Sequence, residues 1–510
     1  MSRTARRVLL TLACLALVPV LALGGLLLWS WNASASDLRG TVDFRHPLPV
    51  PPLADSRVED GVRVFDLTMQ RGRTDFGTGT AYETLGIDGD YLGPTLRARR
   101  GERVRVDVTD EIGERSTLHW HGMHLPAAMD GGPHQMVDPG QTWSPAWEVD
   151  QPAATLWYHP HLHGETADHV YRGLAGLFLV DDGAADRLAL PHEYGVDDVP
   201  LVVQDKVLDD GRLGQGAGLF NPVGTLGDTL VVNGSVAPYL DVATERVRLR
   251  LLNASSSRVY DFALDDARRF DLVATDGGLL AAPERLTHVQ LSPGERAEVV
   301  VTLEPGEQVR LVSLPSTIAG DFFQQRYSGG DDAFDVVQLR AADRLRPSAE
   351  VPAALVPLSH LGDDVVTTRE FRLSTPRING MPMDMGRIDE TVEVGTTERW
   401  VVRNTDGTPH SFHVHDVQFE VVRYDGGPPP PHLRGRKDTV FLPGPVEVEL
   451  LLRFEDHTDP DVPYMFHCHV LQHEDQGMMG QFVVVAPGER AGTPPQAGPV
   501  STPRGEDHDH

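Results

Sequence analysis

Apolar and charged residues alternate in three separate stretches of the chain. In residues 102–109, the sequence Glu-Arg-Val-Arg-Val-Asp-Val-Thr puts every second side chain on one face of an extended backbone. Residues 246–253 and 398–404 repeat this alternation, which predicts half-buried β-strands. Short strands, many glycines and prolines and almost no helical periodicity indicate an all-β protein with three consecutive sandwiches.

The repeats divide the chain into segments of similar length. The ends of the first and third also match, because Gly173–Val180 and Gly477–Val484 share a pattern of glycine, phenylalanine and aliphatic residues. Residues 488–510 are rich in proline, glycine and charge, which predicts a disordered tail. We expect one sandwich in each of three segments, residues 45–185, 198–343 and 367–487, joined by loop-like linkers.

Residues 1–36 have the composition of an export signal or a membrane anchor. Three arginines precede an apolar run from Val8 to about Trp31, and the small residues Ala33-Ser-Ala35 follow it. The run is long enough to span a bilayer, so cleavage and retention both stay open. The Arg6-Arg7 pair resembles a twin-arginine signal, and the general secretory route is the alternative. The folded part is therefore predicted to be secreted, periplasmic or held at the outer face of the cytoplasmic membrane.

Charge and cysteine content narrow the chemistry. The 510-residue chain has 45 basic and 74 acidic residues, a formal net charge of −29, which makes nucleic acid and anionic membrane surfaces poor partners. Its two cysteines are Cys14, inside the export segment, and Cys468. A lone thiol in the folded part of an exported protein has no disulfide partner, and metal ligation is the obvious explanation for it.

Cys468 stands in the most informative stretch, His467-Cys-His-Val-Leu-Gln-His473-Glu-Asp-Gln-Gly-Met478. With one imidazole from elsewhere, Cys468, His473 and Met478 make the thiolate, imidazole and weak axial thioether set of a blue copper site. Neighbouring side chains of an extended segment point to opposite faces, so His467 and His469 should face a second metal. One peptide would then join two metal centres.

Other closely spaced histidines lie in the first and third predicted sandwiches. An H-x-H pair on a strand presents both imidazoles on one face. The second segment has Arg258–Phe262 at the equivalent position and is predicted to be a spacer without ligands. The first has Pro160 where the third has Cys468, so it can supply half of a shared site but no blue copper. The histidine segments contain His119 and His121; His159 and His161; His410, His413 and His415; and His467, His469 and His473.

Together these motifs resemble the signature set of multicopper oxidases, over about residues 45–487. The motifs are His119-Trp-His-Gly122, His159-Pro-His161, His410-Ser-Phe-His-Val-His415, and His467-Cys-His followed by His473 and Met478. With methionine at the axial position, the chain looks most similar to the bacterial laccase-like and cuprous-oxidase branch. The resemblance implies three consecutive cupredoxin-like Greek-key β-sandwich domains and four copper ions.

Carried over residue by residue, the resemblance implies one type 1 copper, one type 2 copper and a type 3 pair. Such enzymes accept single electrons at the type 1 copper and reduce dioxygen to two waters at the other three. The type 1 ligands would be His410, Cys468, His473 and Met478, the type 2 ligands His119 and His413, and the type 3 ligands His121, His159, His161, His415, His467 and His469.

Reduction of dioxygen also needs protons, which positioned carboxylates can deliver. Asp130 and Glu474 match positions where similar enzymes keep such acids. Each also has a plainer interpretation. Asp130 precedes two glycines and would suit a turn, and Glu474 would suit a solvated loop.

Two classes of reductant stay open. Met381, Met383 and Asp384 form a soft, acidic stretch that suits Cu(I), and with Asp406 they resemble the substrate-copper site of cuprous oxidases. The methionines would fill a core seam equally well. The chain lacks the long Met/His-rich insertion of the best-known bacterial copper-tolerance oxidases. A laccase that oxidises phenols or aromatic amines would instead use an open pocket at His473.

Two other classes of protein compete with an oxidase. A non-catalytic copper-binding or periplasmic scaffold protein of the same fold would generally lose ligands, whereas this chain retains the full set. A copper nitrite reductase is disfavoured because such proteins lack the full trinuclear histidine set. The sequence therefore predicts an oxygen-reducing multicopper oxidase whose reductant is Cu(I), a phenol or an aromatic amine.

Overall fold

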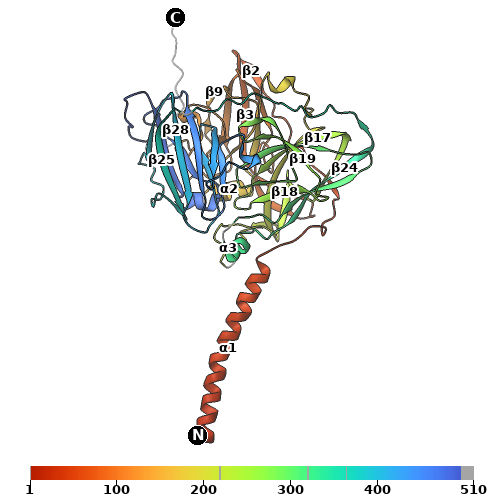
Figure 1. Ribbon diagram of the computed structural model, residues 1–510, viewed down its shortest axis with the longest axis vertical. Helices are drawn as coiled ribbons and strands as arrows, with labels where there is room; N and C mark the ends of the chain where they lie inside the picture. Colours follow the sequence, from red (N-terminus) through yellow and green to blue (C-terminus); the bar gives the residue numbers. More distant parts are fainter. Residues whose placement is uncertain (1, 217–219, 319–320, 363, 496–510) are drawn as a thin grey trace.

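The described residues fold into six β-sheets that pair into three sandwiches, with one long helix, α1 (Arg3–Ala33), projecting from the body (Figure 1). The predicted all-β, three-sandwich architecture is confirmed. The predicted tail lies outside the described residues from residue 496 onward. The computed structural model describes residues 2–216, 220–318, 321–362 and 364–495.

The first sandwich ends at Asp181, and residues of both its sheets, such as Val106 and Phe178, share one core. Burial alternates along β6 (Arg103–Asp110) as the sequence pattern predicts. The first sheet holds β6 with β2 (Arg57–Glu59), β3 (Val62–Asp75), β4 (Ala81–Ile87), β8 (Thr142–Trp143) and β9 (Ala146–Glu148). The second sheet holds β5 (Leu96–Arg99), β7 (His119–His121), β10 (Ala154–His159) and β11 (Gly176–Asp181).

The second sandwich extends past both ends of the segment expected for it. Its strand β1 (His46–Pro47) comes from residues expected in the first sandwich and pairs in parallel with β16 (Pro238–Thr244). Its strand β24 (Phe334–Arg346) continues beyond residue 343. One sheet holds β1, β16, β18 (Tyr260–Leu264), β21 (His288–Leu291), β23 (Gln308–Leu314) and β24. The other holds β12 (Asp198–Asp209), β13 (Arg212–Gly214), β14 (Thr229–Val232), β15 (Ser235–Val236), β17 (Arg246–Asn253), β19 (Phe270–Thr275), β20 (Gly278–Leu286) and β22 (Arg296–Thr302).

The third sandwich has an aromatic core in which Trp400 packs against Phe371, Phe466 and Phe482. One sheet holds β25 (Val365–Ser374), β26 (Arg377–Ile378), β28 (Thr396–Asn404), β30 (Phe419–Tyr424), β31 (Arg436–Lys437) and β33 (Glu447–Phe454). The other holds β27 (Glu390–Glu393), β29 (His410–Val414), β32 (Thr439–Leu442), β34 (Tyr464–Cys468) and β35 (Met479–Val485).

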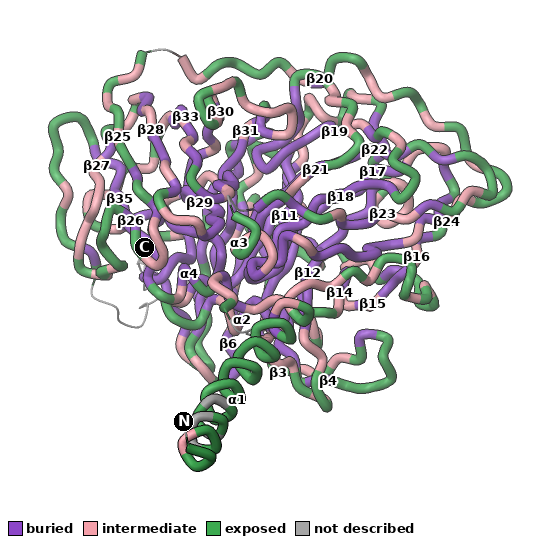
Figure 2. Tube along the Cα trace, turned by 60° about the horizontal axis from the view of Figure 1, so that its bottom comes forward, coloured by how far each residue is buried: buried purple, intermediate pink, exposed green. Residues whose placement is uncertain are grey.

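The remaining helices of the described chain are short. Figure 2 shows most of the described part of α1 exposed, in contrast with the buried strands of the body. Helix α4 carries His473 and Glu474, so a single helical turn follows the cysteine strand. The short helices are α2 (Thr166–Arg172), α3 (Phe322–Tyr327) and α4 (Leu471–Asp475), and the 3₁₀ turns are η1 (Ala127–Met129), η2 (Ala185–Arg187) and η3 (Pro431–Leu433).

Strand β17 departs from the half-buried pattern that its alternation predicts. Arg248 and Arg250 are buried, because Glu298 of β22 forms an ion pair with both guanidinium groups. Arg250 also pairs with Asp198 at 2.6 Å and donates a hydrogen bond to Thr155 of β10, in the first sandwich, at 2.7 Å. The charged face of β17 therefore meets another sandwich instead of solvent.

Replacement of Glu298 should destabilise this interface. In a Glu298→Gln variant two buried guanidinium groups lose their shared carboxylate, a change that typically costs about 3–5 kcal/mol. We expect a clearly lower melting temperature by calorimetry, whereas the exposed Glu304→Gln serves as the control and should melt like the wild type. Equal melting temperatures for all three proteins would show that Glu298 does not hold the interface together.

Candidate metal centre

Strand register brings the four histidine segments together in pairs. In the first sandwich, β10 pairs with β7 so that His159 lies beside His119. In the third, β29 pairs with β34 so that His413 lies beside His467. Each H-x-H segment thus has a partner on the neighbouring strand of its own sheet. Two facing halves of a site result.

The two halves meet between the first and third sandwiches. The rings of His121 and His413 stack with centroids 3.7 Å apart, and those of His119 and His415 stack at 3.9 Å. Across the same contact, Nε2 of His161 lies 3.2 Å from Nε2 of His467. Eight buried histidines therefore form one cluster: His119, His121, His159, His161, His413, His415, His467 and His469.

Hydrogen bonds leave nitrogen lone pairs pointing into this cluster. The Nδ1–H of His119 donates to the carbonyl of Asp130 at 2.9 Å, and that of His413 donates to the carbonyl of Asp438 at 2.8 Å. The Nε2 atoms of both rings are buried and have no hydrogen-bond partner in the described chain. Fixing the outer nitrogen as the donor is how proteins set the tautomer of a metal-binding histidine.

Burial favours the neutral form of several of the clustered imidazoles. Burial, followed by the charge of nearby imidazoles, lowers the pKa of His121, His159, His413 and His415 far below its ordinary value. Burial likewise lowers the pKa of His469 to about 3. A neutral imidazole is the form that binds a metal. Inward-facing lone pairs with no proton between them fit metal ions better than they fit a hydrogen-bonded core.

A second set of donors surrounds the thiol of Cys468. Its Sγ atom lies 3.6 Å from Nδ1 of both His410 and His473. The opposite Nε2 atom of His473 donates to the carbonyl of Pro222 at 3.0 Å, and Nε2 of His410 lies 3.2 Å from Asp406. Both Nδ1 atoms are therefore free to act as donors toward a metal shared with the sulfur. Two nitrogens and one sulfur suit copper.

Met478 lies buried next to this second set. Its N–H donates to the carbonyl of His473 at 2.9 Å, and its carbonyl accepts from the N–H of Cys468 at 3.0 Å. The backbone thus ties the methionine to both neighbouring donors. Since His467 precedes Cys468 on β34, alternation turns the imidazole toward the eight-histidine cluster and the thiol away from it.

Both predicted acids are buried against the cluster. Asp130 accepts a hydrogen bond from Nδ1 of His415 at 2.7 Å, and Gly131 follows it with a positive φ of 79°, where an added Cβ would lie 1.9 Å from the carbonyl oxygen of Leu118. Glu474 is buried on α4 and does not occupy a solvated loop. Burial would raise the pKa of Glu474, but the imidazoles of His161 and His467 outweigh it and hold that pKa below its usual range.

The second sandwich reaches the cluster through residues that the sequence did not reveal. Arg296 of β22 makes a bidentate ion pair with Asp438, at 2.7 and 2.6 Å. The same carboxylate lies 3.0 Å from Nε2 of His121, so it leaves Nδ1 of that ring facing the cluster. Gly294 packs against His469 so closely that an added Cβ would lie 3.0 Å from the ring. A segment expected to be a spacer thus shapes the site.

Two of the predicted substrate residues, Asp406 and Met383, lie next to the cysteine set. Asp406 contacts His410. Burial would raise the pKa of Asp406, but the His410 imidazole outweighs this effect and lowers the pKa to about 2. The Met383 N–H donates to the carbonyl of Gly477, next to Met478, at 2.8 Å. Met381 is 43% exposed, and Asp384 is also exposed, so both are open to solvent.

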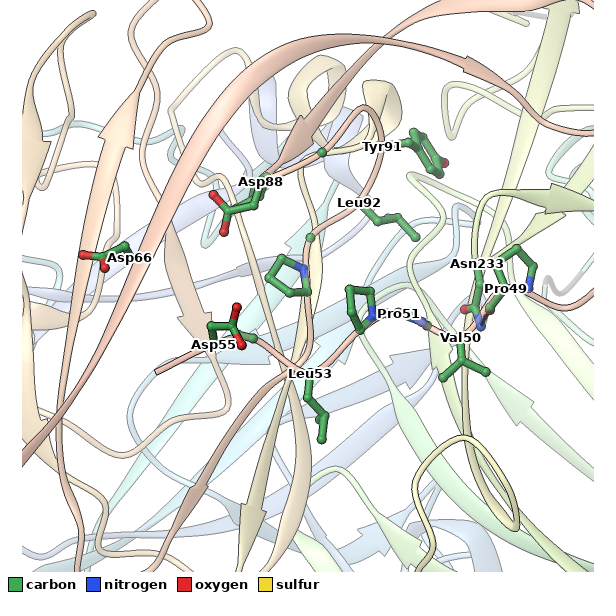
Figure 3. A pocket seen from close by; sticks show the side chains of 16 residues that line it. Pro49, Val50, Pro51, Leu53, Asp55, Asp66, Asp88, Tyr91, Leu92 and Asn233 are labelled. Carbon is green, nitrogen blue, oxygen red and sulfur yellow. Dashed lines mark hydrogen bonds between the residues drawn. The ribbon is translucent and has the colours of Figure 1, made fainter. Parts of the chain in front are cut away.

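A large surface hollow of about 580 Å³ lies elsewhere, between the first and second sandwiches. Figure 3 shows Pro49, Pro51 and Leu53 lining it together with Tyr91 and Asn233. The described residues that line this hollow include no histidine or cysteine. The hollow is therefore separate from the metal centre.

Family models described as multicopper oxidase match residues 68–185, 202–310 and 352–488. The cell division protein FtsP of Dickeya dadantii (strain 3937) is 39% identical to the chain, over 87% of this chain and 93% of that protein. The cell division protein FtsP of Escherichia coli (strain K12) is 37% identical, over 86% of this chain and 93% of that protein.

Solved structures of bacterial oxidases have the same fold. The laccase-like multicopper oxidase CueO from Ochrobactrum sp. is 36% identical with a TM-score of 0.78, and the match covers 86% of this chain and 100% of that one. A laccase from Pediococcus acidilactici is 32% identical with a TM-score of 0.78, over 88% of this chain and 98% of that one.

The thiol of Cys468 should be inert in the folded protein without metal. Burial raises the pKa of Cys468 to about 12, and thiol reagents attack the thiolate. We expect a metal-stripped Cys14→Ser variant to react with an aromatic disulfide reagent at pH 8 at least roughly tenfold more slowly when folded than in guanidinium. Raising the pH toward the pKa should speed the reaction. Fast, stoichiometric reaction of the folded protein at pH 8 would contradict this prediction.

Proposed function

Because the chain belongs to the multicopper oxidase family, we propose that it oxidises a reductant one electron at a time and reduces dioxygen to water. One observation carries the proposal. Cys468 belongs to one donor set, while its covalent neighbours His467 and His469 belong to the other. The shortest bonded path between the two sets is thus a single peptide segment, as an electron relay requires.

We assign the ligands by the same proposal. His410, Cys468, His473 and Met478 would hold a type 1 copper, and His119 with His413 a type 2 copper. His121, His159, His161, His415, His467 and His469 would hold a type 3 pair. When bound, the four copper ions would supply the four one-electron redox steps that reduction of dioxygen to two waters requires. The buried lone pairs and neutral imidazoles support this assignment.

Two carboxylates have positions suited to proton delivery. Asp130 holds the Nδ1 proton of His415 with one oxygen, and its other oxygen, Oδ1, is buried without a hydrogen-bond partner in the described chain. Glu474 lies 3.1 Å from Nδ1 of His467 and 3.3 Å from Nδ1 of His161. We propose that these carboxylates pass protons toward the site where dioxygen is reduced.

The reductant would donate its electron beside His410 and His473. Two observations support Cu(I) as the donor. Asp406 lies next to His410, and Met381 and Asp384 are exposed on either side of Met383 in the sequence. A phenolic donor has different support. The Ochrobactrum oxidase, which is 36% identical, is described as active toward lignin model compounds. Both reductants stay in the proposal until turnover distinguishes them.

A role in cell division is the second candidate function. Its support is the name of relatives that are 37–39% identical over most of their length, together with an apolar helix that would place the body outside the cytoplasm. Such a role would need binding and no turnover. The complete donor set favours the oxidase, because a scaffold has no use for eight buried histidines gathered in one cluster.

Copper loading tests the oxidase directly. The loaded wild type should show a thiolate-to-copper absorption band in the visible range and should take up oxygen with a suitable reductant. Cys468→Ser should lose the band, reduce the copper count by about one and drop oxygen uptake to background, whereas Cys14→Ser should match the wild type. A colourless loaded protein that consumes no oxygen with Cu(I), phenols or aromatic amines would leave the binding role as the explanation.

A second experiment separates the reductants. If Asp384 helps to bind Cu(I), Asp384→Ala should lower Cu(I) turnover roughly tenfold, equivalent to about 1.4 kcal/mol, with little effect on phenol turnover. Asp406→Ala should slow both, because Asp406 also contacts His410. The exposed Asp241→Ala is the control for lost surface charge. Equal Cu(I) turnover in the wild type and Asp384→Ala would eliminate the Cu(I) site at this residue.

A further inference from the structure

The C-terminal end of α1 is held against the body by aromatic contacts with α3. Trp31 lies with its ring centroid 5.7 Å from that of Phe322, 5.9 Å from Phe323 and 6.1 Å from Tyr327, all on α3. Arg326 lies 4.5 Å over the indole ring and donates its Nε–H to the Trp31 carbonyl at 2.8 Å. Helix α1 therefore leaves the body at α3, as Figure 1 shows.

The chain just after α1 is also bound to the second sandwich. The Ser36 N–H donates to the carboxylate of Asp332 at 2.6 Å, and the Leu38 N–H donates to the carbonyl of Ala333 at 2.9 Å. No free linker separates the helix from the body. The surface around α3 must therefore lie in the same environment, membrane or water, as the C-terminal end of α1.

The charge and aromatic pattern of α1 is that of a membrane-spanning helix. Residues 14–33 are long and apolar enough to cross a bilayer by length and composition, and they are almost entirely exposed. Arg3, Arg6 and Arg7 lie at one end of α1, and Trp29 and Trp31 at the other. Basic residues on the cytoplasmic side and tryptophans at the interface are the usual arrangement of a span whose following domain lies outside.

Three large aromatic side chains are exposed next to this end of the helix. Phe220, Phe322 and Phe323 are 59%, 64% and 55% exposed, and we call them the aromatic foot. Phe220 and Phe323 line a hollow of about 350 Å³ together with Leu27 of α1 and Pro222. Because Leu27 belongs to the apolar helix α1, the hollow opens beside that helix.

A residue that lines the hollow also contacts the cysteine donor set. The carbonyl of Pro222 accepts the Nε2–H of His473 at 3.0 Å, and Val223, the next residue, lies in the core of the third sandwich. Gln324 of α3, which also lines the hollow, packs against Gly407, three residues before His410. Pro222 and Gln324 thus connect the hollow beside the aromatic foot to the cysteine donor set by direct contacts.

We propose that the aromatic foot rests in the interfacial layer of the bilayer, and that the hollow behind it binds a lipid-dissolved phenol-class reductant against Pro222, the residue that contacts His473. The contact is apolar, which is compatible with a net charge of −29. The second half rests on the proposed oxidase function. A hydroquinone suits the site because two one-electron losses convert it into a closed-shell quinone. Two hydroquinones break four O–H bonds, and their four electrons and four protons reduce one dioxygen to two waters.

Membrane contact is tested by spin labelling without reference to activity. The experiment uses the full copper-loaded chain with the Cys14→Ser substitution, in phosphatidylcholine vesicles. The spin label is attached to a new cysteine, either Phe323→Cys or, as a control, Val58→Cys. Val58 is 66% exposed on β2, at the end of the body opposite α1 (Figure 1). We expect the label at position 323 to be relaxed mainly by oxygen, and the label at position 58 mainly by a water-soluble nickel chelate.

Three results would overturn the membrane contact. The first is equal access of the nickel chelate to both labels. The second is protection of position 323 in native membranes but not in lipid vesicles, which would assign the foot to a protein partner. The third is a mature chain that has been cleaved near Ala35 and released from the membrane.

Turnover tests the route of the reductant. Oxygen uptake is measured with a long-chain hydroquinone dissolved in the vesicles and with a short, water-soluble hydroquinone. The ratio of the first rate to the second should fall about tenfold in the double variant Phe322→Ser/Phe323→Ser. Val58→Ser should keep the wild-type ratio. An unchanged ratio in the double variant would overturn the proposed route. If no reductant supports oxygen uptake, the oxidase function fails, and label accessibility still decides the membrane contact.

Discussion

Neutral imidazoles that face one another across the contact between the first and third sandwiches are the constraint on which the rest of the structure depends. Their ring nitrogens converge closely, as do the Nε2 atoms of His161 and His467, which lie 3.2 Å apart. Such an arrangement is unfavourable unless cations fill it. The strand register, the outer hydrogen bonds to backbone carbonyls and the burial of the acids all serve to hold these nitrogens in place.

The second sandwich provides the support for this arrangement. Buried ion pairs join it to the third sandwich, since Arg296 pairs with Asp438, and Lys437 of the third sandwich pairs with Asp276 and Glu295. Buried ion pairs contribute little net stability, but loss of one partner is costly, so they enforce one relative placement of the sandwiches. The second sandwich, which supplies no ligand itself, thereby helps to position ligands of the other two sandwiches.

Local spacing made much of this molecule predictable. Alternation predicted β6 and β28, and the paired histidines and lone cysteine predicted two adjoining donor sets. The link from Arg296 to Asp438 spans 142 residues, and that from His473 to Pro222 spans 251, so no spacing pattern indicates them. The burial of Arg250 and Glu474 also depends on surfaces that only the assembled sandwiches provide. Local periodicity does not report such contacts.

The donor set also has a consequence for the order of events in biogenesis. The eight clustered histidines extend from His119 to His469, so the cluster is complete only after nearly the whole chain has been synthesised and two sandwiches have met. No nascent fragment can hold the cluster. A chain that is exported unfolded must acquire its metal in the outer compartment, whereas one exported folded can be loaded beforehand. Maturation of the site is therefore governed by the translocation route.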